Sequence, residues 1–275
     1  MTVSSNGSSP TTAGVWRDAA AAVSLSWRLF RRTIGAKYRK SFLGYFWMVA
    51  PALLITGGAV LASNAGVLAA GDSALPQSLS VFLGTLLWQV FAEAVDVPYQ
   101  AFESARSYLT RVNFSRAAAV LAQLHESVLT TAVRLVVVLA LLAVSGHWYA
   151  ATWLVPVAFA GALALGLGLG CFLLPWQQLF ADVQQTLKLL LGYGLFLTPA
   201  LYQPREPGLF DTIVSANPVS PLIVAAREAA GGAALTQPVA FAVVLAVGVA
   251  AAIAGLALVR AVAPILVERM LLGGR

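Results

Sequence analysis

Six apolar stretches along the chain are long enough to be membrane-spanning helices. A helix needs about 20 apolar residues to cross the hydrocarbon core of a bilayer. The polar-apolar alternation that marks the strands of an outer-membrane barrel does not occur in this sequence. Because backbone amides in lipid must be paired inside the spanning segment, helices are expected. The predicted spans are Gly44–Leu68, Leu79–Val95, Val128–Ser145, Trp153–Leu174, Leu187–Tyr202 and Val239–Val262.

The composition supports this fold class. Of the 275 residues, 59% are hydrophobic and 10% are charged, whereas about 25% of the residues in an average soluble domain are charged. So few charges exclude an ordinary soluble enzyme, and the high apolar content excludes a disordered chain. We expect an all-α integral membrane protein with a six-helix transmembrane domain over residues 44–262.

The Lys and Arg residues lie mostly on one side of the predicted membrane. Arg205 and Arg227 are in outer segments and Arg134 is inside the third span, whereas the other fourteen of the seventeen Lys and Arg residues are in inner segments. Cytoplasmic segments are enriched in these residues. Both termini are therefore predicted to be cytoplasmic, including a tail over residues 263–275. Because the charges follow the membrane topology, the formal charge of +6 does not point to a nucleic-acid partner.

The segment before the first span has the pattern of an amphipathic helix. Residues 1–14 are a Ser/Thr/Gly tail that we expect to be disordered, and residues 15–43 carry apolar residues at spacings of three and four, with arginines elsewhere. Such a helix lies in contact with membrane lipids at the interface and does not cross the bilayer. It is either a general anchor or a collar around the mouth of a pathway. Its predicted interface residues are Trp16, Trp27, Phe30, Arg31 and Arg32.

A patterned segment joins the second and third predicted spans. Pro98–Arg116 mixes aromatic residues with arginines, and it is longer than the roughly 2–8 residues that commonly connect bundled helices. A short cytoplasmic helix of this kind suits the docking of a soluble partner, because aromatic and arginine side chains supply interface anchors. A solvated loop is the alternative. The candidate docking residues are Arg106, Tyr108, Arg111, Phe114 and Arg116.

A second segment outside the spans, residues 203–238, follows the fifth span on the outer side. Its interior, Phe210–Ala230, is too apolar for a solvated loop, and it is too short and too broken by Asn217-Pro218 and Pro221 to cross the membrane. Such segments are usually re-entrant or interfacial. We expect it either to line an opening or to pack against the bundle.

The sequence carries no motif for catalysis or nucleotide binding. A Gly-x-x-x-x-Gly-Lys-Ser/Thr sequence is absent, so the chain is not expected to hold nucleotide phosphates itself. His125 and His147 lack metal-ligand spacing, and the single cysteine, Cys171, excludes an internal disulfide. We therefore expect neither a cofactor nor a metal on this chain.

Ionisable residues in or near a membrane span are functional candidates by default. Glu93 and Asp96 lie close to the predicted cytoplasmic boundary, where hydration costs little, so we expect an ordinary boundary position for them. Arg134 is deeper and is expected to face the bundle or to reach toward the inner surface, and a direct role in transport stays open. A proton-coupled carrier needs several acidic groups near mid-span, which this sequence does not supply.

Aromatic residues near span ends are mostly typical of interface belts. Tyr193 and Phe196 lie deeper, three positions apart on the fifth predicted span, and Tyr45 and Trp47 stand at the inner end of the first. Aromatic rings that stack on sugar faces would provide a sliding, sequence-tolerant surface for a glycan.

The order of several short motifs resembles the permease subunits of type 2 ABC exporters for polysaccharides and polyol phosphates, which serve O-antigen, capsule and teichoic acid export. Lys37–Trp47 with Pro51 is similar to the basic stretch and the Leu-Gly-x-x-Trp-x-x-x-Pro first span of that family. Thr110–Arg116 is similar to its cytoplasmic segment after span two, with Ser115 where a proline is usual. Further matches are Phe180–Val183, Thr198-Pro199 with Tyr202, Asn217-Pro218 and Arg227.

The resemblance implies a bacterial plasma-membrane permease that forms a homodimer with two copies of a separate ATPase, on which ATP and Mg would be bound. It implies that Pro98–Arg116 contains the coupling helix for that ATPase. It also implies that spans one and five of both subunits line a channel, with Tyr45, Trp47, Tyr193 and Phe196 as lining candidates. The implied cargo is a lipid-linked glycan exported from the cytoplasm.

Two other functions remain open at this stage. One is an ABC efflux permease for drugs or lipids, whose cargo would need no long aromatic-lined groove. The other is an intramembrane enzyme acting on lipid-linked sugars, which would need deep acid or base groups within reach of one another. His125 and Arg134 are the residues that such an enzyme would have to use.

Overall fold

The computed structural model describes residues 24–28, 30–31, 34–35, 44–65, 75–109, 116–201 and 209–272, without the side chains of residues 45, 105–109, 116–120, 209–211, 213 and 263–272. All regular structure in these ranges is helical, as predicted. The elements are η1 (Gly44–Met48), α2 (Ala50–Asn64), α3 (Gln77–Leu109), α4 (Arg116–Val144), α5 (Leu154–Leu179), α6 (Ala181–Gly194), η2 (Leu195–Leu197), α7 (Leu209–Ala216), α8 (Ser220–Gly231) and α9 (Pro238–Leu272).

Four helices in the described part of the chain are long and apolar enough to cross a membrane. The corresponding stretches are Gln77–Ser104 in α3, Leu121–Val144 in α4, Leu154–Leu179 in α5 and Pro238–Val262 in α9. The predicted first and fifth spans correspond to shorter helices, since α2 has 15 residues and α6 has 14. The all-helical fold is thus confirmed for the described residues, with four candidate membrane spans, whereas the count of six spans stays a prediction.

Two helices differ in their bounds from the predicted spans. The second span was expected to end at Val95, but α3 continues through Pro98 to Leu109, so the first part of the predicted docking segment is an extension of α3. The fifth span was expected to begin at Leu187, but α6 begins at Ala181. In α3 polar residues follow the apolar run, and in α6 they precede it. A helix can include such residues when their side chains have hydrogen-bond partners.

α5 is the central helix, because it packs against both α3 and α9. On the α3 side, a Cβ at Gly166 would lie 2.4 Å from the carbonyl oxygen of Phe91, and one at Gly170 would lie 2.1 Å from that of Val95. On the α9 side, a Cβ at Gly168 would lie 2.7 Å from the backbone of Ala251. Small residues at these positions let the backbones approach closely, which is how membrane helices gain packing energy.

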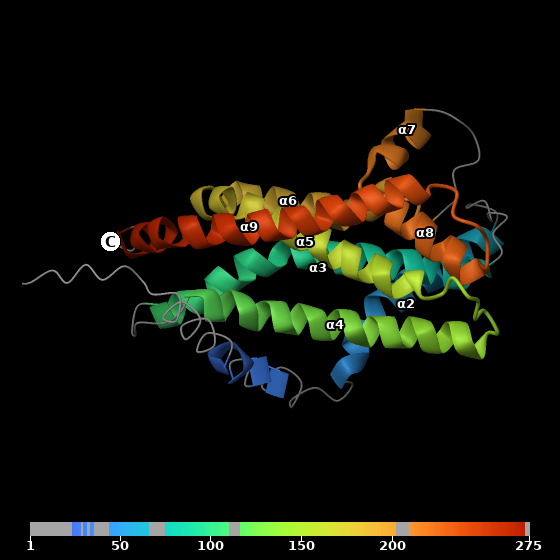
Figure 1. Cartoon of the computed structure of the whole chain (residues 1–275), viewed down its shortest axis with the longest axis horizontal. Helices are drawn as coiled ribbons and strands as arrows, with labels where there is room; N and C mark the ends of the chain where they lie inside the picture. Colours follow the sequence, from blue (N-terminus) through green and yellow to red (C-terminus); the bar gives the residue numbers. More distant parts are fainter. Residues whose placement is uncertain are drawn as a thin grey trace, which may run out of the picture.

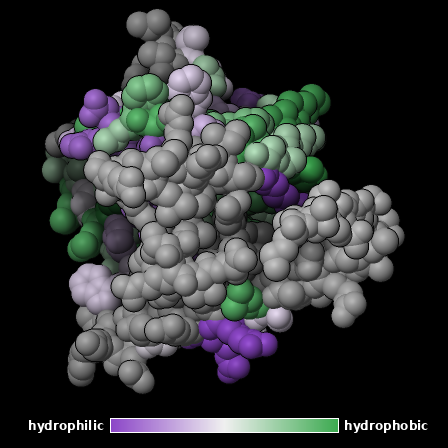
Figure 2. Space-filling model, turned by 90° about the vertical axis from the view of Figure 1, so that its left-hand side faces the viewer, coloured by the Kyte–Doolittle hydropathy of each residue, from purple (hydrophilic) through white to green (hydrophobic). Residues whose placement is uncertain are grey.

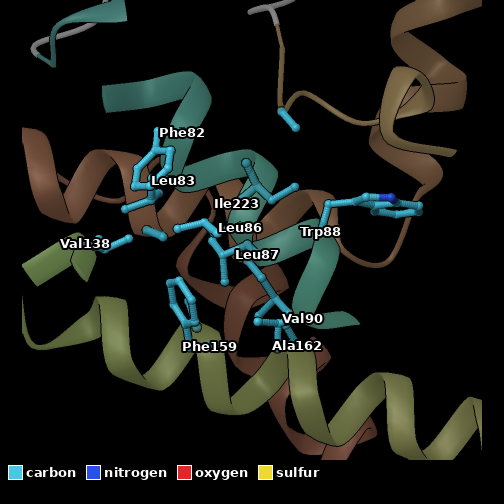
Figure 3. Close-up of a cluster of buried hydrophobic side chains, with 14 of the residues drawn as sticks. Phe82, Leu83, Leu86, Leu87, Trp88, Val90, Val138, Phe159, Ala162 and Ile223 are labelled. Carbon is cyan, nitrogen blue, oxygen red and sulfur yellow. The ribbon is translucent and has the colours of Figure 1, made fainter. Parts of the chain in front are cut away.

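The core lies where α3 meets α4, α5 and α8 (Figure 3). Leu86 and Leu87 of α3 are fully buried there, with Phe159 of α5 and Ile223 of α8 also inaccessible to solvent. α3 contacts α2, α4, α5 and α8, so its polar residues are placed between several neighbours.

The short helix α8 is packed inside the bundle. Nearly all of its residues from Ser220 to Ala230 are buried, and it contacts α3, α5 and α9. Before it, α7 ends at Ala216, and the Oδ1 of Asn217 accepts the backbone N–H of Val219 at 3.0 Å. α8 thus packs against the bundle, which was one of the two alternatives for this segment, whereas its re-entrant position in a membrane stays a prediction.

The described N-terminal residues and the C-terminal end of α9 lie at the same end of the bundle (Figure 1). α3 and α5 also end there, and α4 and α6 begin there. Figure 2 faces this end and shows both hydrophilic and hydrophobic described residues at its rim. The up-and-down order of these helices is the one that the predicted topology requires. We refer to this end as the terminal end of the bundle.

Candidate functional site

An ion pair inside the bundle joins α3 and α4. The side chain of Arg134 is 3% exposed, its Nη1 donates to Oε2 of Glu93 at 2.9 Å, and its Nη2 donates to Oε1. The Nε of the same guanidinium donates to the backbone carbonyl of Met48 at 2.9 Å. A bidentate arginine–carboxylate pair is among the strongest polar contacts that proteins make. Arg134 therefore faces the bundle, as one of the two sequence-based alternatives proposed.

A cavity of about 460 Å³ lies beside this ion pair. It is bounded by η1 and the start of α2 on one side and by α3 and α4 on the other. Glu93 forms part of its wall, and the side chain of Glu93 is 50% exposed. The wall is polar over much of its area: the polar side chains are Glu93, Gln100, Gln123, Glu126, Ser127, Thr130 and Arg134, and the aromatic one is Trp47.

A chain of hydrogen bonds leads from the cavity to α6. Gln100, which lines the cavity, donates to Oδ2 of Asp96 at 2.6 Å. Oδ1 of Asp96 accepts from Gln184 of α6 at 2.7 Å, and Gln184 in turn accepts from Gln177 of α5 at 2.8 Å. The sequence-based interpretation of Glu93 and Asp96 as ordinary boundary residues missed both contacts, since their partners lie 41 and 88 positions away.

Of the three channel candidates whose side chains are described, Trp47 alone lines the cavity. Trp47 is 59% exposed and lines the cavity, and the side chain of Tyr45 lies outside the described part. Tyr193 and Phe196 are 68% and 57% exposed at the end of α6 and in η2, away from the cavity wall. Nothing tests their role in a channel, which stays a prediction.

Trp88 holds the end of α6, a role that the sequence did not indicate. Its indole N–H donates to the carbonyl of Leu191 at 3.0 Å, and the last four carbonyls of a helix lack partners inside the helix. Its ring lies on Gly194, where a Cβ would come within 2.5 Å of the ring carbon Cζ2. The side chains of Tyr193 and Phe196 are thus displayed from a helix end that is anchored on α3.

Arg227 is buried on α8 and donates to three backbone carbonyls. Its Nε donates to Ser80 at 3.0 Å, its Nη1 to Pro199 and its Nη2 to Ala200. These carbonyls belong to the start of α3 and to the turn after η2, so one guanidinium joins three separate segments. Gly84 leaves room for it, because a Cβ there would lie 2.9 Å from Nη2 of Arg227.

The predicted interface helix contacts α4 through aromatic rings. Phe30 is buried and its ring centroid lies 5.7 Å from that of His125, and Trp27 lies 5.8 Å from the same imidazole. Arg31 is exposed. Trp16 and Arg32 lie outside the described residues, and the amphipathic pattern is consistent with the part that is described.

The predicted docking residues are only partly covered. Arg106 and Tyr108 belong to the last turns of α3 and Arg116 is the first residue of α4, all three without described side chains. Arg111 and Phe114 lie outside the described residues. The structure therefore does not test their contacts, and docking stays a prediction.

The two residues that an intramembrane enzyme would need are not in contact. The guanidinium of Arg134 is bound to Glu93 and Met48, whereas Nδ1 of His125 lies on the carbonyl of Leu121. Within the described residues, no cluster of three or more His, Cys, Asp or Glu side chains could hold a metal ion.

Comparison with known proteins shows that the chain is similar in sequence to an export permease. No protein-family model matches the chain. The O-antigen export system permease protein RfbA of Myxococcus xanthus is 30% identical to it over 190 residues, which cover 63% of this chain and 66% of that protein. Over the larger part of both sequences, the chain is thus similar to the permease of an O-antigen export system.

Proposed function

We propose that this protein is the permease subunit of an ABC transporter that exports a lipid-linked polysaccharide across the bacterial plasma membrane. The observation that carries the proposal is its 30% identity to an O-antigen export permease. It is supported by the four long apolar helices of the described chain and by the family motifs, which occur in the expected order.

In this proposal the chain has no catalytic site of its own. A homodimer of the permease pairs with two copies of an ATPase subunit, which bind ATP and Mg at the cytoplasmic ends of the helices. The terminal end of the bundle is the cytoplasmic end, so both termini face the cytoplasm. ATP binding and hydrolysis shift the bundle between two states through the docking segment at residues 98–116.

The proposal is tested by gentle purification of the tagged chain from its native membrane and identification of co-purifying proteins by mass spectrometry. A stoichiometric ATPase subunit is expected. The double variant Arg111→Glu with Phe114→Ala should lose it, because a reversed charge and a truncated aromatic side chain remove two interface anchors.

A matched control changes one side chain to glutamate and one aromatic to alanine at the opposite end of the bundle. Ala150→Glu with Trp148→Ala does so in the exposed turn between α4 and α5 and should keep the ATPase. A chain that purifies without any nucleotide-binding partner would contradict the exporter function. Loss of the ATPase in both double variants would contradict the placement of the docking segment.

A further inference from the structure

The polar cavity between η1, α3 and α4 is not explained by the predicted channel. Tyr193 and Phe196 do not line it, and among the channel candidates with described side chains Trp47 alone belongs to both sets. Its volume of about 460 Å³ lies within the range of roughly 300–1,000 Å³ that is usual for small-ligand sites. The polar side chains that line it between apolar helices form a surface on which a polar ligand can make hydrogen bonds.

We propose that this cavity binds a sugar ring of the exported glycolipid. This inference rests on the proposed function and goes beyond it by assigning a cargo site and its residues. The glycan chemistry follows from the lining: the carboxylates of Glu93 and Glu126 accept hydrogen bonds, and the amides of Gln100 and Gln123 both donate and accept them. A sugar hydroxyl also both donates and accepts, so it complements such a mixed wall.

Trp47 supplies the apolar part of the site. Its side chain is 59% exposed, and it lines the cavity together with the polar residues of α3 and α4. An indole presents a flat apolar face with a polar edge, which matches a sugar ring that is apolar on its C–H face and polar around its rim. The η1 helix thereby contributes a stacking surface, and α3 and α4 contribute the hydrogen bonds.

The charges of the described lining disfavour the other small ligands. The guanidinium of Arg134 is bound at both terminal nitrogens by Glu93, and a phosphate would also meet the carboxylates of Glu93 and Glu126. A simple ammonium group would be attracted by these carboxylates, but it only donates. Gln100 and Gln123 each give one amide proton to a carboxylate, of Asp96 and Glu126 respectively, and an ammonium cannot accept their second protons. A neutral polyol satisfies both kinds of group.

The test measures whether a sugar headgroup shields the cavity. The chain's single cysteine is buried, so Cys171→Ala gives a cysteine-free background into which Thr130→Cys is introduced as a reporter on the cavity wall. The full-length protein is placed in lipid nanodiscs and labelled with a hydrophilic methanethiosulfonate reagent. The probes are dodecyl glycosides with glucosyl, galactosyl and maltosyl headgroups, each added below its critical micelle concentration.

At a probe concentration ten times its dissociation constant, we expect labelling of Thr130→Cys to slow about tenfold, because only the unoccupied fraction reacts. Dodecylphosphocholine and a dodecyl polyethylene glycol ether carry the same tail and should not slow it. Ala150→Cys, in the exposed turn before α5, is the control reporter, and its labelling should not change with any probe.

Adding Trp47→Leu to the Thr130→Cys reporter should abolish protection, whereas Trp153→Leu, an exposed tryptophan at the other end of the bundle, should keep it. If Trp47→Leu does not fold, Gln123→Leu takes its place. Equal protection by all dodecyl probes, protection by dodecylphosphocholine alone, or no protection by any glycoside would each overturn the proposal. Co-purification of the ATPase is scored separately: an associated ATPase without sugar protection defeats only this inference, and sugar protection without an ATPase defeats the exporter function.

Discussion

The guanidinium of Arg134 on α4 donates hydrogen bonds to both carboxylate oxygens of Glu93 on α3. It also donates one to the backbone carbonyl of Met48 at the end of η1. Three segments far apart in the sequence are joined at one buried side chain that also lines the polar cavity. Because a lone buried charge is costly, the buried Arg134 depends on Glu93 for its counter-charge, whereas Glu93 is half exposed. Any change in how η1 sits against α3 and α4 must alter these contacts, so this pair is a natural place to probe the bundle.

Removing one partner of this pair should destabilise the protein more than removing both. Glu93→Gln leaves Arg134 buried without its counter-charge and is expected to lower the free energy of unfolding by about 3 kcal/mol, the lower end for a buried pair, because Glu93 is half exposed. Adding Arg134→Met should recover part of that loss. The measurement is detergent-induced unfolding of all four proteins of the double-mutant cycle.

The matched control uses the exposed charges Asp182 and Lys188 on α6, since Asp182→Asn and Lys188→Met should each change stability by less than about 0.5 kcal/mol. Strictly additive effects of Glu93→Gln and Arg134→Met would show that the two side chains do not interact in solution.

Trp88→Phe should loosen the end of α6 while leaving the core nearly intact. The phenyl ring still fills the position beside Gly194, but the hydrogen bond to the carbonyl of Leu191 is lost, at a cost of about 1–2 kcal/mol. Thermal unfolding in detergent measures this loss. Trp153→Phe, at an exposed tryptophan, is the comparison and should have little effect. Equal stability of the two variants would contradict the capping role of Trp88.

Two glycine-to-alanine variants should shift stability in opposite directions. Gly170→Ala places a Cβ 2.1 Å from the carbonyl oxygen of Val95, so α3 and α5 must separate, at a cost of about 1–3 kcal/mol. Gly192 on α6 has open space around the same position, so Gly192→Ala should stabilise the helix by up to about 1 kcal/mol. The free energy of unfolding of both variants decides this. A Gly170→Ala protein as stable as the parent would disprove the close approach of the two helices.

Arg227→Lys should be poorly tolerated although it keeps the charge. A lysine ammonium is a point donor that cannot reproduce the planar fork holding Ser80, Pro199 and Ala200. Leaving a buried carbonyl without its partner costs about 1–3 kcal/mol, so we expect a loss of at least about 2 kcal/mol in unfolding free energy. Arg260→Lys, at an exposed position on α9, should be neutral. Equal melting temperatures for the two would mean that the fork geometry of Arg227 does not matter.

The predicted helices agree best with the structure where the apolar residues of a helix alone determine its position. α4, α5 and α9 contain the predicted apolar runs, and their ends lie within a few residues of the predicted ones on at least one side. α3 was predicted too short because the apolar run ends before Asp96. Gln184 and Gln100 satisfy that carboxylate from two helices, so the helix continues. The sequence alone could not show this, since the key partner is 88 positions away.

Only part of the candidate site could be predicted, again because contacting residues lie far apart in the sequence. Trp47 was singled out as a lining residue, and it does line a cavity, but the polar walls of that cavity were not foreseen. Glu126, Ser127 and Thr130 share one face of α4, a pattern that marks a polar stripe on an otherwise apolar helix and would have indicated the site. Trp88 was given no individual role from the sequence, and Arg227 was noted only as a family match. Their partners are backbone carbonyls of α3, of α6 and of the turn after η2, which a side-chain pattern does not reveal.

The residues of each segment by themselves determined that this is a helical membrane protein, where its long apolar helices lie, and which residues interrupt them with charge. Those properties depend on the transfer of each segment into lipid and on hydrogen bonds within it, which are local. The tertiary structure decided which polar groups meet. The pairing of Arg134 with Glu93, the contact of Trp88 with α6 and the cavity beside Trp47 depend on how closely and at what rotation the helices pack. Glycines such as Gly166 and Gly170 set that packing only once the partner helix is in place.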